Sequence, residues 1–122
     1  MPLDVRDAAL LQDMLDSARR ALAYARGRVR AELDSDLLFA DAVVRRIEIV
    51  GEAARGVSDA LRDANPHIPW RAITTTRHIL AHNYADVNFD IVWRILQDHL
   101  PPLIPQLEAL LSQAPPLPPA QP

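Results

Sequence analysis

The sequence predicts an all-α protein, an antiparallel bundle of four to five helices. Apolar residues recur at steps of three and four along most of the chain, which is the spacing of one face of a helix. Only 5% of the residues are aromatic and only three are glycine, which argues against a sandwich or barrel of short strands. The chain has 122 residues, of which 49% are hydrophobic and 24% charged, as expected for one globular domain.

The first predicted helix runs from about Asp4 to about Arg30. Its apolar stripe consists of Leu11, Leu15, Ala18, Leu22, Ala25 and Val29. Leu10, Met14 and Ala21 widen this apolar face. Because a bundle of this size would struggle to cover so much apolar surface, we predict that the chain forms a symmetric homodimer.

The second predicted helix follows a polar turn over residues 32–36, in which Asp34 or Ser35 is available as the N-cap. The apolar stripe of this helix consists of Ala40, Val43, Ile47, Val50, Ala54 and Val57. Gly51 lies within it, where glycine costs about 1 kcal/mol relative to alanine. This cost predicts that another helix, from this chain or from a second copy, approaches closely at Gly51.

Caps and prolines divide the next part of the chain. Ser58 is expected to cap a short helix that runs to about Ala64, because the following Asn-Pro pair ends it. Pro69 suits the start of a helix, which predicts that the next helix begins near Trp70 and fades after residues 82–84.

The last predicted helix begins at a cap formed by Asn88. Its inward residues are expected to be Ile91, Val92, Ile95, Leu96 and His99. The prolines Pro101, Pro102 and Pro105 are expected to break or kink it, because each removes a backbone donor. A further helical piece is predicted over residues 103–111.

The chain is expected to consist of one helical domain, residues 1–113, and a proline-rich tail, residues 114–122. The tail has five prolines in nine residues, so it is predicted to be disordered or polyproline II. Charged residues from Asp4 onward leave no apolar core for a signal peptide, and no stretch approaches a membrane span. We therefore expect a soluble, cytoplasmic protein.

The net charge of −3 gives no general argument for nucleic-acid binding. The basic residues are nevertheless unusual, because all 13 are arginine and none is lysine. Five of them lie between residues 17 and 31, where there is no acidic residue: Arg19, Arg20, Arg26, Arg28 and Arg30. One interpretation is a solvated helix end, where cations suit the helix dipole. The other is a patch that contacts phosphates, which arginine binds bidentately. From the count alone the first interpretation is favoured.

Few residues could hold a metal. The absence of cysteine excludes thiolate sites and cysteine nucleophiles. His78 and His82 share one helix face, but no glutamate follows His78 and a third ligand is missing. We therefore expect neither a metal nor another cofactor. Glu48 and Glu52 are expected to pair with neighbouring arginines on the second helix.

Polar chemistry is concentrated in residues 77–84. On an ideal helix Arg77 and Tyr84 project in nearly the same direction, whereas His82 lies about 140° from Arg77. Arg77 and His82 reach one cleft only if the helix ends near His82 or the cleft joins two protomers. With Asn83 they supply a permanent cation, a proton shuttle and hydrogen-bonding groups, a set that suits phosphodiester chemistry without a metal. The alternative is an Arg–Tyr contact and a helix-ending histidine in an ordinary bundle.

The order Arg77, four residues, His82, one residue, Tyr84 resembles the signature of HEPN-domain ribonucleases in the HepT branch. Three further segments resemble that family in order and spacing: residues 46–54, residues 66–71 and residues 87–93. The run of prolines from Pro101 to Pro105 exceeds the single proline of the family pattern. The resemblance implies an all-α bundle that dimerises with its motif helices facing each other across a cleft.

The resemblance also implies a function, that of a bacterial toxin that cuts RNA without a metal and has tRNA as its expected target. His82 would be the general acid and base, and Arg77 would hold the substrate phosphate. His78 and Asn83 would be supporting residues of the cleft, and the RNA 2′-hydroxyl would be the attacking group. The arginines of residues 19–30 would then be an RNA-contacting patch.

Tyr84 matches the tyrosine that the partner antitoxin, an MntA-type nucleotidyltransferase, modifies with AMP. The added phosphate would compete with RNA for Arg77. A second hypothesis is a non-catalytic dimer that docks a nucleotidyltransferase and presents Tyr84 or a substrate to it. Both hypotheses use the same fold, so the fold alone does not separate them.

Overall fold

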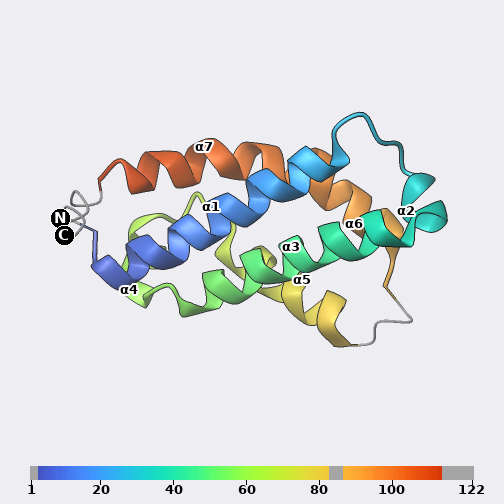
Figure 1. Cartoon of the computed structure of the whole chain (residues 1–122). Helices are drawn as coiled ribbons and strands as arrows, with labels where there is room; N and C mark the ends of the chain where they lie inside the picture. Colours follow the sequence, from blue (N-terminus) through green and yellow to red (C-terminus); the bar gives the residue numbers. More distant parts are fainter. Residues whose placement is uncertain (1–2, 83–86, 114–122) are drawn as a thin grey trace, which may run out of the picture.

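A computed structural model describes residues 3–82 and 87–113, and of residues 77–82 it describes the backbone only. All regular elements of these residues are helical, which confirms the predicted all-α class (Figure 1). The helices are α1 (Val5–Ala25), α2 (Glu32–Ser35), α3 (Leu37–Gly56), α4 (Asp59–Ala64), α5 (Trp70–His82), α6 (Phe89–Arg94), the π-helical η2 (Ile95–His99) and α7 (Leu100–Leu111). The described residues thus form four long helical segments, the last of them α6–η2–α7, and two short helices.

The long segments lie side by side with α1 in the middle. Helix α1 packs against α3 on one side and α7 on the other, and α5 packs against α3 (Figure 1). The start of α1 and the end of α7 lie at the same end of the bundle (Figure 1).

Helix α1 is shorter than predicted. Asp4 caps its start, where a carboxylate oxygen accepts hydrogen bonds from the backbone N–H groups of Arg6 and Asp7 at 3.1 and 3.3 Å. The prediction that the helix continues to about residue 30 is wrong, because the chain leaves the helix at Arg26, whose backbone is extended, and turns at Gly27, which adopts φ = 74°. Val29 consequently leaves the apolar stripe and is 59% exposed.

The connection to α3 also differs from the prediction. Residues 32–35 form the short helix α2 rather than a turn, and the N-cap of α3 is Asp36 instead of Asp34 or Ser35. Asp36 has the extended backbone of an N-cap and accepts a hydrogen bond from the N–H of Phe39 at 3.2 Å.

The predicted stripe of α3 is confirmed, because all six of its residues are buried: Ala40, Val43, Ile47, Val50, Ala54 and Val57. Gly51 is buried as well. Ser58 caps α4, as predicted, by accepting a hydrogen bond from the N–H of Leu61 at 3.3 Å.

The last helical segment continues through the prolines. Asn88 caps α6, as predicted, with its side-chain oxygen 2.9 Å from the N–H of Asp90. Pro101 and Pro102 cannot donate to the carbonyls four residues earlier. The chain passes this point through η2, where the N–H of Leu100 bonds to the carbonyl of Ile95 five residues back, and α7 begins at Leu100 rather than at residue 103.

The inward face of this segment is predicted correctly except at one position. Val92, Ile95 and Leu96 are buried and Ile91 is half-buried. The prediction for His99 is wrong, because this residue is exposed. A π-turn changes the direction in which the side chains after it project, and His99 is the last residue of η2.

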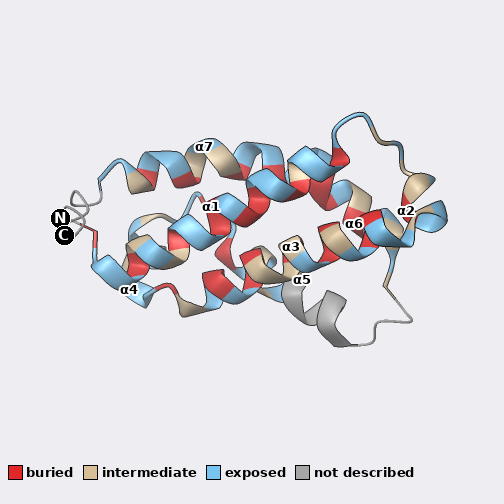
Figure 2. Ribbon diagram, in the orientation of Figure 1, coloured by how far each residue is buried: buried red, intermediate tan, exposed pale blue. Residues whose placement is uncertain are grey.

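The core lies between α1, α3 and the last helical segment (Figure 2). Its largest fully buried side chains are Leu11, Met14, Leu33, Val43, Val57, Ile68, Val92, Leu96 and Leu107. Met14 and Ala21 are thus covered within one chain, and Leu10 is half-buried against the core. These three side chains therefore give no support to the homodimer, which stays a prediction.

No helix in the described part of the chain is long and apolar enough to cross a membrane. The proline-rich tail predicted for residues 114–122 lies outside the described residues.

Candidate active site

The start of α5 is fixed by two buried side chains. Ile68 and Trp70 are 1% and 7% exposed, and the indole Nε1–H of Trp70 donates to the carbonyl of Asn65 at 3.0 Å. The carbonyl of Pro69 accepts the N–H of Ile73 at 3.0 Å, which closes the first turn. This anchoring sets the direction of α5, the helix that carries the predicted catalytic residues.

The predicted catalytic residues lie at the other end of α5. Arg77, His78 and His82 all have helical backbone, and His82 is the last residue of the helix. Arg77 and His82 are five residues apart, about 7.5 Å along the helix axis. The side chains of these three residues lie outside the described part, as do Asn83 and Tyr84 altogether. The cleft arrangement predicted for these five residues therefore stays a prediction.

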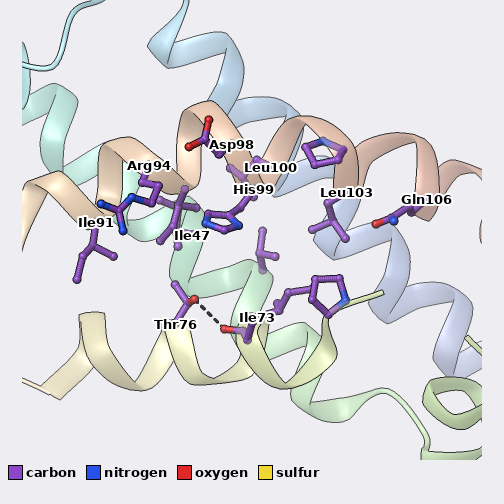
Figure 3. A pocket seen from close by; sticks show the side chains of 15 residues that line it. Ile47, Ile73, Thr76, Ile91, Arg94, Asp98, His99, Leu100, Leu103 and Gln106 are labelled. Atoms are coloured by element: carbon purple, nitrogen blue, oxygen red, sulfur yellow. Dashed lines mark hydrogen bonds between the residues drawn. The ribbon is translucent and has the colours of Figure 1, made fainter. Parts of the chain in front are cut away.

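A cavity of about 460 Å³ lies beside α5, between this helix, α3 and the last helical segment (Figure 3). Its wall is mostly aliphatic and includes Ile47, Ile73 and Leu103. Thr76, the residue directly before Arg77, also lines the cavity. Its hydroxyl donates a hydrogen bond to the carbonyl of Ala72 at 2.8 Å. The cavity therefore adjoins the helix that carries the motif.

Arg94 and His99 line this cavity as well. The predicted site does not include them, because the sequence pattern treats His99 as an inward core residue. A signal was available, since Arg94 and His99 repeat the spacing of Arg77 and His82, an arginine followed after four residues by a histidine.

The predicted RNA-contacting arginines are largely engaged in ion pairs. Arg19 lies 2.6 Å from Glu108 of α7. Arg28 lies 2.8 Å from Glu32 and 3.0 Å from Asp36.

Arg30 is paired twice, at 2.8 Å from Asp34 and at 2.8 Å from Asp90. Its bond to Asp90 ties the loop after α1 to the first turn of α6. Arg20 and Arg26 are exposed, and within the described residues neither forms an ion pair. Of the predicted patch, only these two arginines have no carboxylate partner of their own there.

The corner between α1 and α3 is held by charges and by one aromatic contact. The guanidinium of Arg28 lies 4.6 Å from the centre of the buried Phe39 ring. The pKa of Glu32 is lowered mainly by a hydrogen bond from the backbone N–H of Val29 and, second, by a hydrogen bond from the Arg28 side chain. The pKa of Asp36 is lowered by the N–H of Phe39 and then by Arg28.

The two arginines of this corner shift in the opposite direction. The pKa of Arg28 is raised by its side-chain hydrogen bonds, most by the bond to Asp36 and next by the bond to Glu32. The pKa of Arg30 is raised in the same way, most by the bond to Asp90 and next by the bond to Asp34. Both guanidinium groups therefore stay charged, and their ion pairs stabilise the connection between α1 and α3. On α3, Glu48 pairs with Arg45 at 3.5 Å, as the sequence predicts, whereas Glu52 forms no ion pair within the described residues.

Comparison with known proteins gives consistent results. A family model described as Ribonuclease HepT-like matches residues 14–110. A curated relative named "Putative RNase MJ1380", from Methanocaldococcus jannaschii, is 29% identical over 100 residues, which cover 82% of this chain and 92% of that protein. "Putative RNase TTE0752", from Caldanaerobacter subterraneus, is 27% identical over 103 residues, covering 84% and 92% respectively.

A third relative, "Probable ribonuclease HepT" from Thermococcus cleftensis, is 33% identical over 69 residues, which cover 57% of this chain and 63% of that protein. No solved structure matches the chain. The family match extends over most of the helical bundle and includes the whole motif on and after α5. The chain belongs to the HepT-like ribonuclease family of the HEPN superfamily.

Proposed function

We propose that this protein is an endoribonuclease that cleaves RNA without a metal ion, with Arg77 and His82 as its catalytic residues. One observation carries the proposal. A chain of the HepT-like ribonuclease family retains Arg77, His82 and Tyr84 at the family spacing, beginning on the last turns of a firmly anchored helix. A protein that only docked a partner would not require all three.

The chemistry uses the 2′-hydroxyl of the substrate. His82 takes the proton of this hydroxyl, whose oxygen attacks the adjacent phosphorus while the bond to the 5′-oxygen breaks. The departing 5′-oxygen takes up a proton, leaving a 2′,3′-cyclic phosphate on one fragment and a 5′-hydroxyl on the other. Arg77 binds the phosphate and stabilises the charge that builds on its oxygens. His78 and Asn83 support the substrate in the cleft.

A substrate with one altered sugar tests this route. An RNA that the protein cuts at a single position should resist cleavage when that nucleotide carries 2′-deoxyribose, because the attacking oxygen is gone. The matched control carries the 2′-deoxyribose one nucleotide away and should still be cut. Cleavage of both oligonucleotides at equal rates would contradict attack by the 2′-oxygen.

We further propose that the protein is the toxin of a toxin–antitoxin pair, with tRNA as the RNA target. Its antitoxin is an MntA-type nucleotidyltransferase that transfers AMP from ATP to the Tyr84 hydroxyl and releases pyrophosphate. The AMP phosphate then occupies the position of the RNA phosphate beside Arg77 and blocks cleavage by charge and bulk.

Modification is tested with an MntA-type nucleotidyltransferase, ATP and Mg²⁺. Intact-mass measurement should show one added AMP on the wild type and none on Tyr84→Phe, and the modified wild type should no longer cut RNA. Tyr24→Phe is the matched control, because Tyr24 lies on the exposed surface of α1. Addition of AMP to Tyr84→Phe would contradict this assignment.

A further inference from the structure

The cavity beside α5 combines an aliphatic wall with two cationic or proton-donating side chains. Arg94 and His99 line the cavity along the edge formed by α6 and η2, and the His99 ring lies in the space between this edge and α5 (Figure 3). Asp98 is the one carboxylate among the described lining residues, and it points to the other side of the helix (Figure 3). Within the described residues neither Arg94 nor His99 forms an ion pair or a side-chain hydrogen bond.

The π-turn explains why the side chains of Arg94 and His99 lie at the same edge of the cavity. On a regular α-helix, residues five apart project about 140° from each other. The turn of η2 contains a backbone bond from Leu100 to Ile95, and such bonds, which span five residues, bring positions five apart closer to one face. Turns of this kind are frequent at functional sites. Here the turn precedes Pro101 and Pro102, which prevent ordinary α-helical bonding.

We infer that this cavity is a binding site for a nucleoside monophosphate unit, which it holds through residues outside the predicted catalytic motif. Arg94 binds the phosphate through its guanidinium, and His99 donates a second hydrogen bond to it. The base lies against the aliphatic wall formed by Ile47, Ile73 and Leu103.

Size and charge both fit such a ligand. A volume of about 460 Å³ is within the range of about 300–1,000 Å³ of small-molecule pockets. An apolar wall with a few polar groups at one edge is the usual composition of such a pocket, and it suits a ring at one end and an anion at the other. Thr76 and Gln106 add hydrogen-bonding groups for a base or a sugar at the rim.

The unit can come from two sources: a nucleotide of an RNA strand or a free mononucleotide. The first case rests on the proposed ribonuclease function and would make the cavity a substrate subsite, because Thr76 directly precedes Arg77 on α5. The second does not depend on cleavage. The experiment therefore measures binding, with His82→Ala as background so that the RNA stays intact.

Calorimetric titrations with 5′-AMP, adenosine and a short single-stranded RNA test the site. Each is repeated with Arg94→Gln and His99→Gln, and with the matched controls Arg6→Gln and His67→Gln, which change exposed residues that are not among the lining residues of the cavity. Loss of Arg94 should weaken binding about tenfold or more, as expected for one charge-assisted contact to phosphate. The controls should leave binding unchanged.

A second pair of variants tests the cavity without removing charge. Ala72 is exposed and lines the cavity, so Ala72→Phe should fill part of it and weaken binding while the core stays intact. Ala60→Phe, at an exposed position of α4, is its control. Thermal unfolding followed by circular dichroism verifies that each variant is folded.

The outcomes separate the two sources. Binding of AMP that needs Arg94, and is stronger than binding of adenosine, supports the site for a free nucleotide. Failure of AMP to bind, with RNA binding weakened by Arg94→Gln and Ala72→Phe, supports a subsite for the strand. If these variants change the binding of neither AMP nor RNA, the inference is overturned, whether or not the wild type cuts RNA.

Discussion

Gly27 lies in the turn by which the chain leaves α1 after Ala25, and its φ of 74° belongs to the left-handed region. A Cβ at this position would meet no neighbouring atom within 4 Å, so the cost of a substitution comes from the backbone alone. Gly27→Ala should lower the free energy of unfolding by roughly 1–2 kcal/mol, measured by urea denaturation. Val29→Ala, at an exposed position of the same loop, should change it by less than about 0.5 kcal/mol. Equal stability of Gly27→Ala and the wild type would contradict this explanation of why α1 ends.

Asp7 is a buried carboxylate, 5% exposed, that joins the start of α1 to the start of α4. Its two oxygens accept the backbone N–H of Ser58 at 2.9 Å and the Ser58 hydroxyl at 2.6 Å. Asp7→Ala leaves both donors without a partner and should cost about 1–3 kcal/mol in chemical denaturation. Asp13→Ala, on the exposed face of α1, is the control. A cost for Asp7→Ala no greater than that of the control would show that these bonds do not stabilise the fold.

At the scale of elements, the corner between α1 and α3 should respond to acid. The pKa values of Glu32 and Asp36 are lowered in the folded protein from their ordinary values near 4, by backbone N–H groups first and by Arg28 second. Their contribution to stability is therefore complete above about pH 5 and is lost as the pH falls through the folded pKa values.

The corner is tested with the double variant Glu32→Gln and Asp36→Asn. Urea unfolding from pH 7 to pH 3 should show the wild type more stable at neutral pH and the difference shrinking below about pH 4. A difference that stays constant over this range would mean that the two carboxylates do not contribute through their charge.

The helices that depend on local signals were predictable from the sequence. Ser58, Asn88 and the apolar stripe of α3 occupy their predicted positions, because caps and helical periodicity are properties of neighbouring residues. The errors concern backbone turns that apolar periodicity does not reveal. The chain leaves α1 at Arg26 and Gly27, and Arg30, which lies outside the helix, binds Asp90, 60 residues away in sequence. The prolines were predicted to break or kink the last helix, and η2 interrupts the α-helix just before them, in a form that no periodicity indicates.

The sequence was enough to predict the catalytic motif, but not the structure that surrounds it. The spacing of Arg77 and His82 identifies the motif, and the structure adds that α5 is anchored at Trp70 and borders a cavity. That cavity is formed by helices distant in sequence, so Arg94 and His99 could be associated with it only once the fold was known. The carboxylates that pair with Arg19 and Arg30 come partly from α7 and α6, which the sequence could not indicate, and RNA contact by the arginine patch stays a prediction.

At the scale of the whole molecule, the predicted assembly is a symmetric homodimer with the two motif helices facing each other across a cleft. Sedimentation equilibrium of the full chain should give about twice the chain mass of 13.6 kDa. A mass that stays at one chain at micromolar concentration would contradict the dimer, and with it a cleft shared by two copies of Arg77 and His82.

The central claim is that His82 performs RNA cleavage without a metal. The most direct measurement compares RNA cleavage by the wild type, His82→Ala and His67→Ala in excess chelator, after intact mass has shown that Tyr84 is unmodified. His67 is exposed and precedes α5, so its replacement controls for loss of a surface histidine. We expect the wild type and His67→Ala to cut equally and His82→Ala to be slower by roughly 10²–10⁴-fold, the contribution of a general acid–base group. Equal cleavage by all three proteins, or none by the unmodified wild type, would contradict the claim and favour a non-catalytic docking subunit.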